Sequence, residues 1–420
     1  MSERFDTLFS GISEENALNL IITDPSQLDN PGVKYLAASR LGACTSQQSF
    51  DRLIEVASKE SDDLYERITR RKALEALGRR KQKTALPVLI EALTDQDEPT
   101  VVNAVDSIAR IGASLTETQQ QQLLTALNGP DNQKRAVIQA FTRLNLPDSN
   151  DVIAELRGDL NPLVAGAAHA HAHAHALRLT NRDESLGPLL SQLQDTNPGR
   201  RRAAVIDLGD AQHLAALEAL TRCPVSMPLR AKSAFLITKA QSEGNREDIN
   251  KTHSDALLET LLRDDPRTLA LANPSPIPSE AEAIRAGLQH RDEARQYEAA
   301  KALCEMPATE RLALIDDLEE NQGSDYGVHY LLASCVGLLE LQDRSNLVRR
   351  ALQETGPQYS KSRIAAAWSC LRLQLDDQKP LLKELAETHP WEPLRWSFTQ
   401  VLEKWAEASK SLHILSANLY

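Results

Sequence analysis

The segment SDYGVHYLLASC, residues 324–335, brings together side chains that can exchange protons. Asp325, Tyr326, His329, Tyr330 and Cys335 supply a carboxylate, two phenols, an imidazole and a thiol. Helical spacing places Tyr326 and Tyr330 on one face, at the N-terminal end of the predicted helix. A tyrosine beside an aspartate could act as an acid/base pair. The alternative is that Asp325 only caps the helix and that the tyrosines pack.

A second candidate is the run HAHAHAHA, which places His169, His171, His173 and His175 in one predicted helix. Helical angles pair His169 with His173 and His171 with His175, on roughly opposite faces. Either pair could donate protons or bind a transition metal, but each supplies only two ligands and no third lies nearby. We therefore predict no metal site. One pair is expected to contact a ligand and the other to pack. The alternative is that the histidines have no functional role and only occupy positions on an alanine-rich helix.

A third candidate is the basic stretch RITRRKALEALGRRK, residues 67–81. Arg70, Arg71 and Lys72 lie in its first half, and guanidinium and ammonium groups of this kind bind carboxylates or phosphates. The competing interpretation is ion pairing with Glu66, Glu75 and neighbouring acids along a solvated ridge. The sequence leaves both interpretations open.

These residues lie in helices that recur along the chain. A turn containing Asp, Asn or Pro precedes an amphipathic helix, and the turns begin near Pro31, Asp62, Pro99, Asn132, Pro162, Pro198 and Pro228, at steps of 30 to 37 residues. Companion helices such as TALPVLIEALTD fill the intervals. This period is typical of antiparallel helix pairs that stack into a solenoid. We predict an all-α, HEAT-like solenoid of about ten or eleven pairs, with capping Asp or Asn and first-turn Pro in many repeats.

The predicted array is interrupted once. Residues 241–254 are polar, and NPSPIPS at 273–279 contains three prolines. We therefore expect an N-terminal solenoid over 1–240, a joint over 241–279 and a C-terminal solenoid over 280–420.

Composition narrows the class of protein. The 420 residues carry a net charge of −12 and only 4% aromatic side chains, which favours small-residue helix packing and disfavours nonspecific nucleic-acid binding. No run of about 18 apolar residues is present, so no membrane span is expected. The five cysteines are scattered, which favours reduced thiols and a cytoplasmic location.

Longer motifs carry a resemblance to a known family. FDTLFSGISEENAL, DNPGVKYLAASRLGAC and above all LYERITRRKALEALGRRK, followed by ALPVLIEAL and TVVNAVDSIARIG, resemble the cyanobacterial phycobilin lyases of the E/F type. The likeness is to the single-chain branch that acts on phycoerythrin. It covers most of residues 5–240 and continues more weakly to the C-terminus.

The resemblance implies attachment of phycoerythrobilin, an open-chain tetrapyrrole, to a cysteine of a phycoerythrin α subunit through a thioether. Some members of this branch also isomerise the product to phycourobilin. The implied partners are this subunit and the bilin, which is a substrate, and no separate cofactor is implied. Because the acceptor supplies the thiolate, the chain's own cysteines are expected to be structural.

The resemblance also assigns roles to the candidate residues. The two propionates of the bilin would pair with cations among Arg70, Arg71, Lys72 and Arg230. Asp325 would face the protonated pyrrole nitrogens, and Tyr330 would contact the pigment. Proton transfer would fall to Tyr326, with His329 or His173 as second choices.

Two other functions compete with the lyase. A non-catalytic HEAT scaffold or chaperone would bind a phycobiliprotein subunit without transferring pigment. Phosphopeptide or nucleic-acid binding through residues 67–81 is disfavoured by the acidic total.

Overall fold

The computed structural model describes residues 11–147, 151–179, 186–243, 249–269 and 276–417, and these residues form helices without any strand. The chain divides into two compact units, Met1–Leu189 (unit 1) and Leu190–Tyr420 (unit 2), with the boundary inside α12 (Gly187–Gln192). The all-α solenoid predicted from the repeat is confirmed.

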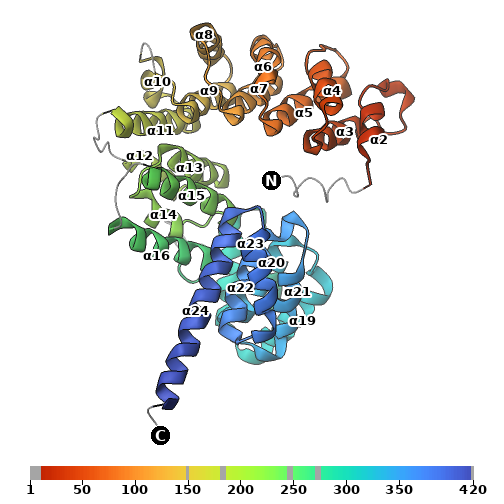
Figure 1. The fold of residues 1–420 in the computed structure, drawn as a ribbon. Helices are drawn as coiled ribbons and strands as arrows, with labels where there is room; N and C mark the ends of the chain where they lie inside the picture. The colour runs from red at the N-terminus through yellow and green to blue at the C-terminus, as the bar shows by residue number, and fades with distance from the viewer. Residues whose placement is uncertain (1–10, 148–150, 180–185, 244–248, 270–275, 418–420) are drawn as a thin grey trace. The chain divides into compact units, whose positions relative to one another are not determined.

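Unit 1 consists of two layers of helices (Figure 1). Its main layer, in which successive helices pack side by side, contains α3 (Val33–Ala43), α5 (Leu64–Arg80), α7 (Glu98–Ile111), α9 (Asp131–Leu144) and α11 (Pro162–Leu179). Its second layer contains α4 (Gln47–Ala57), α6 (Leu86–Glu91), α8 (Glu117–Thr125) and α10 (Val152–Glu155), and α2 (Glu14–Leu20) begins the array. Several second-layer helices end in a short 3-10 turn: Ala92–Thr94, Ala126–Asn128 and Leu156–Gly158.

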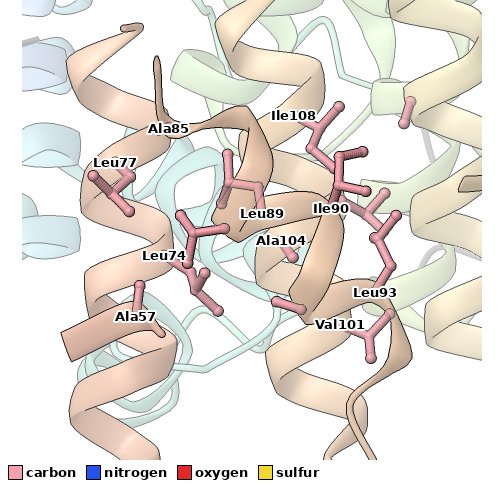
Figure 2. Packing of buried hydrophobic residues seen from close by; sticks show 14 of the residues in the cluster. Ala57, Leu74, Leu77, Ala85, Leu89, Ile90, Leu93, Val101, Ala104 and Ile108 are labelled. Carbon is pink, nitrogen blue, oxygen red and sulfur yellow. The ribbon is translucent and has the colours of Figure 1, made fainter. Parts of the chain in front are cut away.

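The core of unit 1 lies between these layers (Figure 2). Leu74 and Leu77 of α5 pack with Leu89 of α6 and Ala104 and Ile108 of α7, and all five are fully buried. The apolar positions recur at helical spacing, which is why one face of each helix is buried. The predicted helix starts are also confirmed, because Asp63 caps α5 and Asp97 caps α7, with Pro99 in its first turn.

Unit 2 begins with α13 (Pro198–Ala211), α14 (Ala216–Arg222), α15 (Met227–Glu243) and α16 (Ile249–Arg263). It continues with α17 (Ala281–Leu288), α18 (Glu293–Glu305), α19 (Ala308–Gln322), α20 (Tyr326–Leu338), α21 (Ser345–Gln353), α22 (Ser360–Leu373), α23 (Lys379–Thr388) and α24 (Glu392–Ala417). Helix α20 packs on α18 and α22, and α22 packs on α24. Helix α16 contacts both α15 and α22, so the early and late helices of unit 2 share one body.

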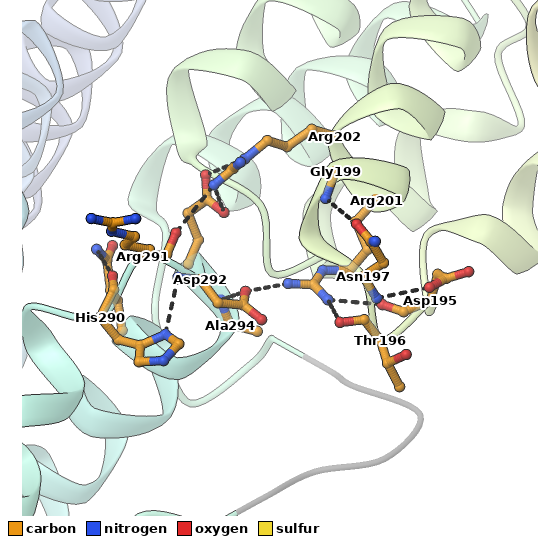
Figure 3. Close-up of polar contacts among 12 residues, drawn as sticks. Asp195, Thr196, Asn197, Gly199, Arg201, Arg202, His290, Arg291, Asp292 and Ala294 are labelled. Carbon is orange, nitrogen blue, oxygen red and sulfur yellow. Dashed lines mark hydrogen bonds and ion pairs between the residues drawn. The ribbon is translucent and has the colours of Figure 1, made fainter. Parts of the chain in front are cut away.

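Ion pairs at helix starts reinforce this arrangement (Figure 3). At the start of α13, Arg201 pairs with Asp292 and Arg202 forms a bidentate pair with Glu293, at 2.7 and 2.8 Å. Asp292 also caps α18, and Asn197 caps α13. The first turns of two helices 91 residues apart are thereby held together.

The expected joint over 241–279 differs from the observed structure. Helix α15 continues to Glu243, and α16 occupies Ile249–Arg263 because Leu258, Leu261 and Leu262 are buried at helical spacing. Residues 244–248 and 270–275 of the expected joint lie outside the described residues. The boundary between the compact units falls earlier than the sequence suggested.

Within the described residues, no helix combines the length and the hydropathy that crossing a bilayer requires.

Candidate functional site

The candidate site of unit 2 lies at the N-terminal end of α20. The carboxylate of Asp325 accepts hydrogen bonds from the backbone N–H groups of Gly327 and Val328, at 2.8 and 3.0 Å, and so caps the helix. The residue is nevertheless exposed, so its second oxygen can face a ligand. The capping role and the proposed catalytic role are therefore compatible at this position.

Next to the cap, three aromatic side chains form one cluster. The ring of Tyr326 is 49% exposed and meets the ring of Tyr359 edge to face, with 5.2 Å between centroids. His329 lies one helical turn further, and its ring is 4.9 Å from that of Tyr359. The structure thus places two of the predicted residues, Tyr326 and His329, against a third that the sequence analysis did not select.

His329 is suited to proton transfer. Burial lowers the pKa of His329, and the nearby Glu354 carboxylate only partly offsets this effect, so the imidazole is neutral near pH 7. Its Nδ1 atom is buried and has no hydrogen-bond partner within the part of the chain that the structure describes. A neutral imidazole with an open nitrogen can accept a proton or bind a polar group.

Tyr330, predicted to contact the pigment, is only 3% exposed. Its hydroxyl donates to the Asp264 carboxylate, which also accepts a 2.6 Å hydrogen bond from Tyr297. Tyr330 therefore supports the cluster from beneath through its buried hydroxyl, while Tyr326 on the same helix face is accessible.

The prediction for Arg230 needs correction. This side chain is 0% exposed, pairs with Asp264 and donates 2.7 and 3.2 Å hydrogen bonds to the carbonyls of Val225 and Thr221. Burial alone would lower the pKa of Arg230, but the Asp264 carboxylate outweighs it and raises the pKa. A guanidinium so enclosed and so fully bonded is a core element and cannot meet a propionate from solution.

Cations in the basic stretch of unit 1, residues 67–81, also form ion pairs within the protein. Arg70 pairs with Asp95 and donates a 2.8 Å hydrogen bond to the Ala57 carbonyl, and Arg71 forms a bidentate pair with Asp97. Partial burial would raise the pKa of Asp97, but hydrogen bonds from Arg71 and Thr100 hold it at about 2. These cations join neighbouring repeats.

Lys72, the third predicted cation of this stretch, is also paired with an acid. Its ammonium donates a 2.6 Å hydrogen bond to Glu75 and lies 4.7 Å from the ring centroid of Tyr35. Of the two interpretations of residues 67–81, the structure therefore favours ion pairing.

His173 is also inaccessible, because it is 2% exposed in α11. Its neighbour His171 is buried as well, with Nδ1 3.2 Å from the Thr142 hydroxyl, and the His171 and His175 rings stack at 6.1 Å. The faces of the run are thus not divided as predicted, because α11 buries one member of each i,i+4 pair, His171 and His173.

The five cysteines are all buried and unbridged. Burial raises the pKa of Cys223 to about 11 and that of Cys370 to about 12, which suppresses their thiolates at neutral pH. This environment agrees with structural roles for these two residues.

A residue beside the cluster was also missed by the sequence analysis. The ammonium of Lys361, in the first turn of α22, lies 4.9 Å from the ring centroid of Tyr330. A signal was present, because a lysine in the first turn of a helix opposes the helix dipole and is unfavourable without another reason.

Comparison with known proteins defines the class of this protein. A family model described as HEAT repeats matches residues 64–142. The chain resembles the solved complex of CpcE and CpcF of phycocyanin lyase from Nostoc sp. PCC7120, with a TM-score of 0.51 and 21% identity, over 60% of this chain and 95% of that one. This likeness supports the fold. The chain thus has a HEAT-like solenoid fold.

Two relatives match along almost the whole length. The uncharacterized phycocyanin operon protein Y of Pseudanabaena tenuis (strain PCC 7409) is 29% identical, over 97% of this chain and 96% of that protein. The bilin biosynthesis protein CpeY of Synechococcus sp. (strain WH8020) is 25% identical, over 92% and 93% respectively. The resemblance to the phycobilin lyases of the E/F type, inferred above from motifs, is confirmed.

Proposed function

We propose that this protein is a phycobilin lyase that attaches phycoerythrobilin through a thioether to a cysteine of a phycoerythrin α subunit. The observation that carries the proposal is the similarity to a bilin biosynthesis protein over 92% of the chain. The site at the start of α20, formed by Asp325, Tyr326, His329 and Tyr359, supports the proposal, and we call it the α20 cluster. It presents a carboxylate, phenol groups and a neutral imidazole together at the surface of unit 2.

The chemistry of thioether formation matches these groups. The thiol of the acceptor adds across the ethylidene group of ring A, so a sulfur–carbon bond forms and a proton must reach the ring system. Tyr326 is the proposed proton donor because its hydroxyl belongs to the most exposed ring of the cluster. Asp325 would stabilise the positive charge of the protonated pyrroles, and His329 would take up the proton that the thiol loses and pass it to Tyr326.

Isomerisation to phycourobilin is the further step that we propose. It requires removal of one proton from the bound pigment and addition of another nearby. Tyr326 and His329 both contact Tyr359, so a donor and an acceptor lie against the same ring. This arrangement supports both transfers at one site.

A non-catalytic scaffold for phycobiliprotein subunits is the second candidate. The packed helices α3 and α5 expose four large apolar or aromatic side chains, which would suit a protein partner: Tyr35, Leu36, Leu64 and Tyr65. A scaffold would bind the subunit through this surface and transfer no pigment.

The test is co-expression of the full chain with a phycoerythrin α subunit and the enzymes that make phycoerythrobilin. Absorbance of the denatured subunit then measures covalent pigment. We expect Tyr326→Phe to reduce attachment by about 100-fold or more, because general acid catalysis contributes this much. Asp325→Asn should also reduce it, since asparagine preserves the helix cap and removes only the charge.

Asp63→Asn is the matched control, because Asp63 caps α5 in the same way through the backbone N–H of Glu66. It should attach pigment like the unmodified chain. A blue-shifted phycourobilin spectrum would support isomerisation. If the subunit binds without covalent pigment, or if Tyr326→Phe and Asp325→Asn attach pigment normally, the scaffold is the better description.

A further inference from the structure

Lys361 places a positive charge at the edge of the α20 cluster. It lies two residues after Tyr359 in the first turn of α22, and its ammonium sits over the ring of Tyr330 at 4.9 Å. Tyr326 and Tyr330 are one helical turn apart on the same face of α20. The ammonium therefore lies against the residue that is one helical turn from Tyr326, whose ring meets that of Tyr359.

This ammonium contacts the ring of Tyr330, but it forms no hydrogen bond or ion pair with any residue that the structure describes. Three other half-buried or buried lysines differ. Lys34 bonds to Glu66, Lys72 bonds to Glu75, and Lys379, which also lies over an aromatic ring, pairs with Asp376. Partial burial of a cation without an acceptor carries a cost, so its retention points to a ligand.

The surrounding carboxylates do not remove this cost. Asp264, Asp325 and Glu293 attract the ammonium from a distance, and burial nevertheless lowers the pKa of Lys361. Asp264 is already paired with Arg230, and Glu293 with Arg202. The dipole of α22 adds a further unfavourable term at this position. An anion arriving from solution would relieve all of these effects.

We propose that Lys361 is a carboxylate-binding residue of this site, which takes a propionate of an open-chain tetrapyrrole lying against Tyr326 and Tyr359. The inference rests on the proposed function and makes it more specific. It also replaces the earlier choices, because Arg230 is enclosed in the core and Arg70, Arg71 and Lys72 are held by acids of their own unit. An ammonium binds such a carboxylate as a point charge.

The experiment compares two pigments and three proteins. Biliverdin carries free propionates and biliverdin dimethyl ester does not, so the ester removes the charge that Lys361 would bind. Binding is titrated by visible absorbance with the full chain, Lys361→Met and Lys379→Met. Lys379 is the matched control because it has the same ring contact, 4.4 Å from Trp405, but a partner in Asp376.

We expect Lys361→Met to weaken biliverdin binding about ten-fold and to leave ester binding unchanged. Lys361→Arg should restore most of the affinity for biliverdin, and Lys379→Met should bind both pigments normally. Tryptophan fluorescence checks that each variant is folded.

Two results would overturn the inference and leave the proposed function standing. In one, Lys361→Met binds biliverdin as tightly as the unmodified chain. In the other, it loses affinity equally for the acid and the ester, which would mean that the side chain acts through packing alone. If the unmodified chain binds neither pigment, the inference fails, and the proposed function is then judged by covalent attachment of phycoerythrobilin alone.

Discussion

Asp264 organises the buried polar contacts of unit 2. It follows α16 with a left-handed backbone at φ 46°, a conformation that aspartate tolerates better than most residues. Its carboxylate accepts from Arg230 of α15, Tyr297 of α18 and Tyr330 of α20. One side chain thereby connects three helices and holds the α20 cluster from below.

At this scale we predict that Arg230→Met lowers the free energy of unfolding of unit 2 by about 3–5 kcal/mol, because it leaves the buried Asp264 carboxylate without its cation. Urea unfolding followed by tryptophan fluorescence measures this, since all four tryptophans lie in unit 2. Arg200→Met is the control and should change stability by less than about 1 kcal/mol, because the Arg200–Asp195 pair is exposed.

The opposite result would restore the role that the sequence suggested for Arg230. If Arg230→Met unfolded like the unmodified protein but bound biliverdin much more weakly, the guanidinium would be a ligand residue and would not be needed for the stability of the core.

At the scale of the element, small residues decide how closely the main-layer helices approach. A methyl group at Gly78 of α5 would lie 2.7 Å from the Cα atom of Ser107 in α7. A methyl group at Gly337 of α20 would likewise lie 2.7 Å from the Cα atom of Ser369 in α22. The same close approach therefore recurs in both units, and it follows from the low aromatic content of the sequence.

We predict that Gly78→Ala lowers stability by about 1–2 kcal/mol. The added methyl group meets backbone that cannot move away, and this overpacking exceeds the gain in helix propensity of less than about 1 kcal/mol. Gly158→Ala in the same unit should be neutral or slightly stabilising, because nothing lies within 4 Å of the added atom. Thermal unfolding followed by circular dichroism compares the two. Equal melting temperatures for both variants would mean that α5 and α7 can separate without cost.

At the scale of the whole molecule, stability is expected to be distributed as in other repeat proteins, where each element depends on its neighbours. Unit 1 and unit 2 are compact bodies with separate internal packing. A local defect should therefore weaken the unit that contains it and leave the other unit protected.

Hydrogen exchange tests this expectation. Gly78→Ala should accelerate exchange in α5 and α7 without affecting α20 and α22, and Gly337→Ala should do the reverse. Accelerated exchange in both units from either substitution would show that the chain opens as a single cooperative body.

The sequence by itself determined the class of fold and the resemblance to the bilin lyases. The period of turns, the capping aspartates and the apolar stripes are local properties, and local properties are readable without coordinates. The pairing of Asp325, Tyr326 and His329 in one helical turn was determined in the same way.

Only the tertiary structure decided which charged side chains can bind a ligand. Arg70, Arg71 and Arg230 looked like ligand residues, but their partners Asp95, Asp97 and Asp264 lie 25, 26 and 34 residues away. Lys361 looked ordinary, yet it is the cation left without a partner beside the α20 cluster in the described structure. The reason is physical: a charge is neutralised by whichever residue folding brings near it, and stacking of repeats sets that neighbour across helices rather than along the chain.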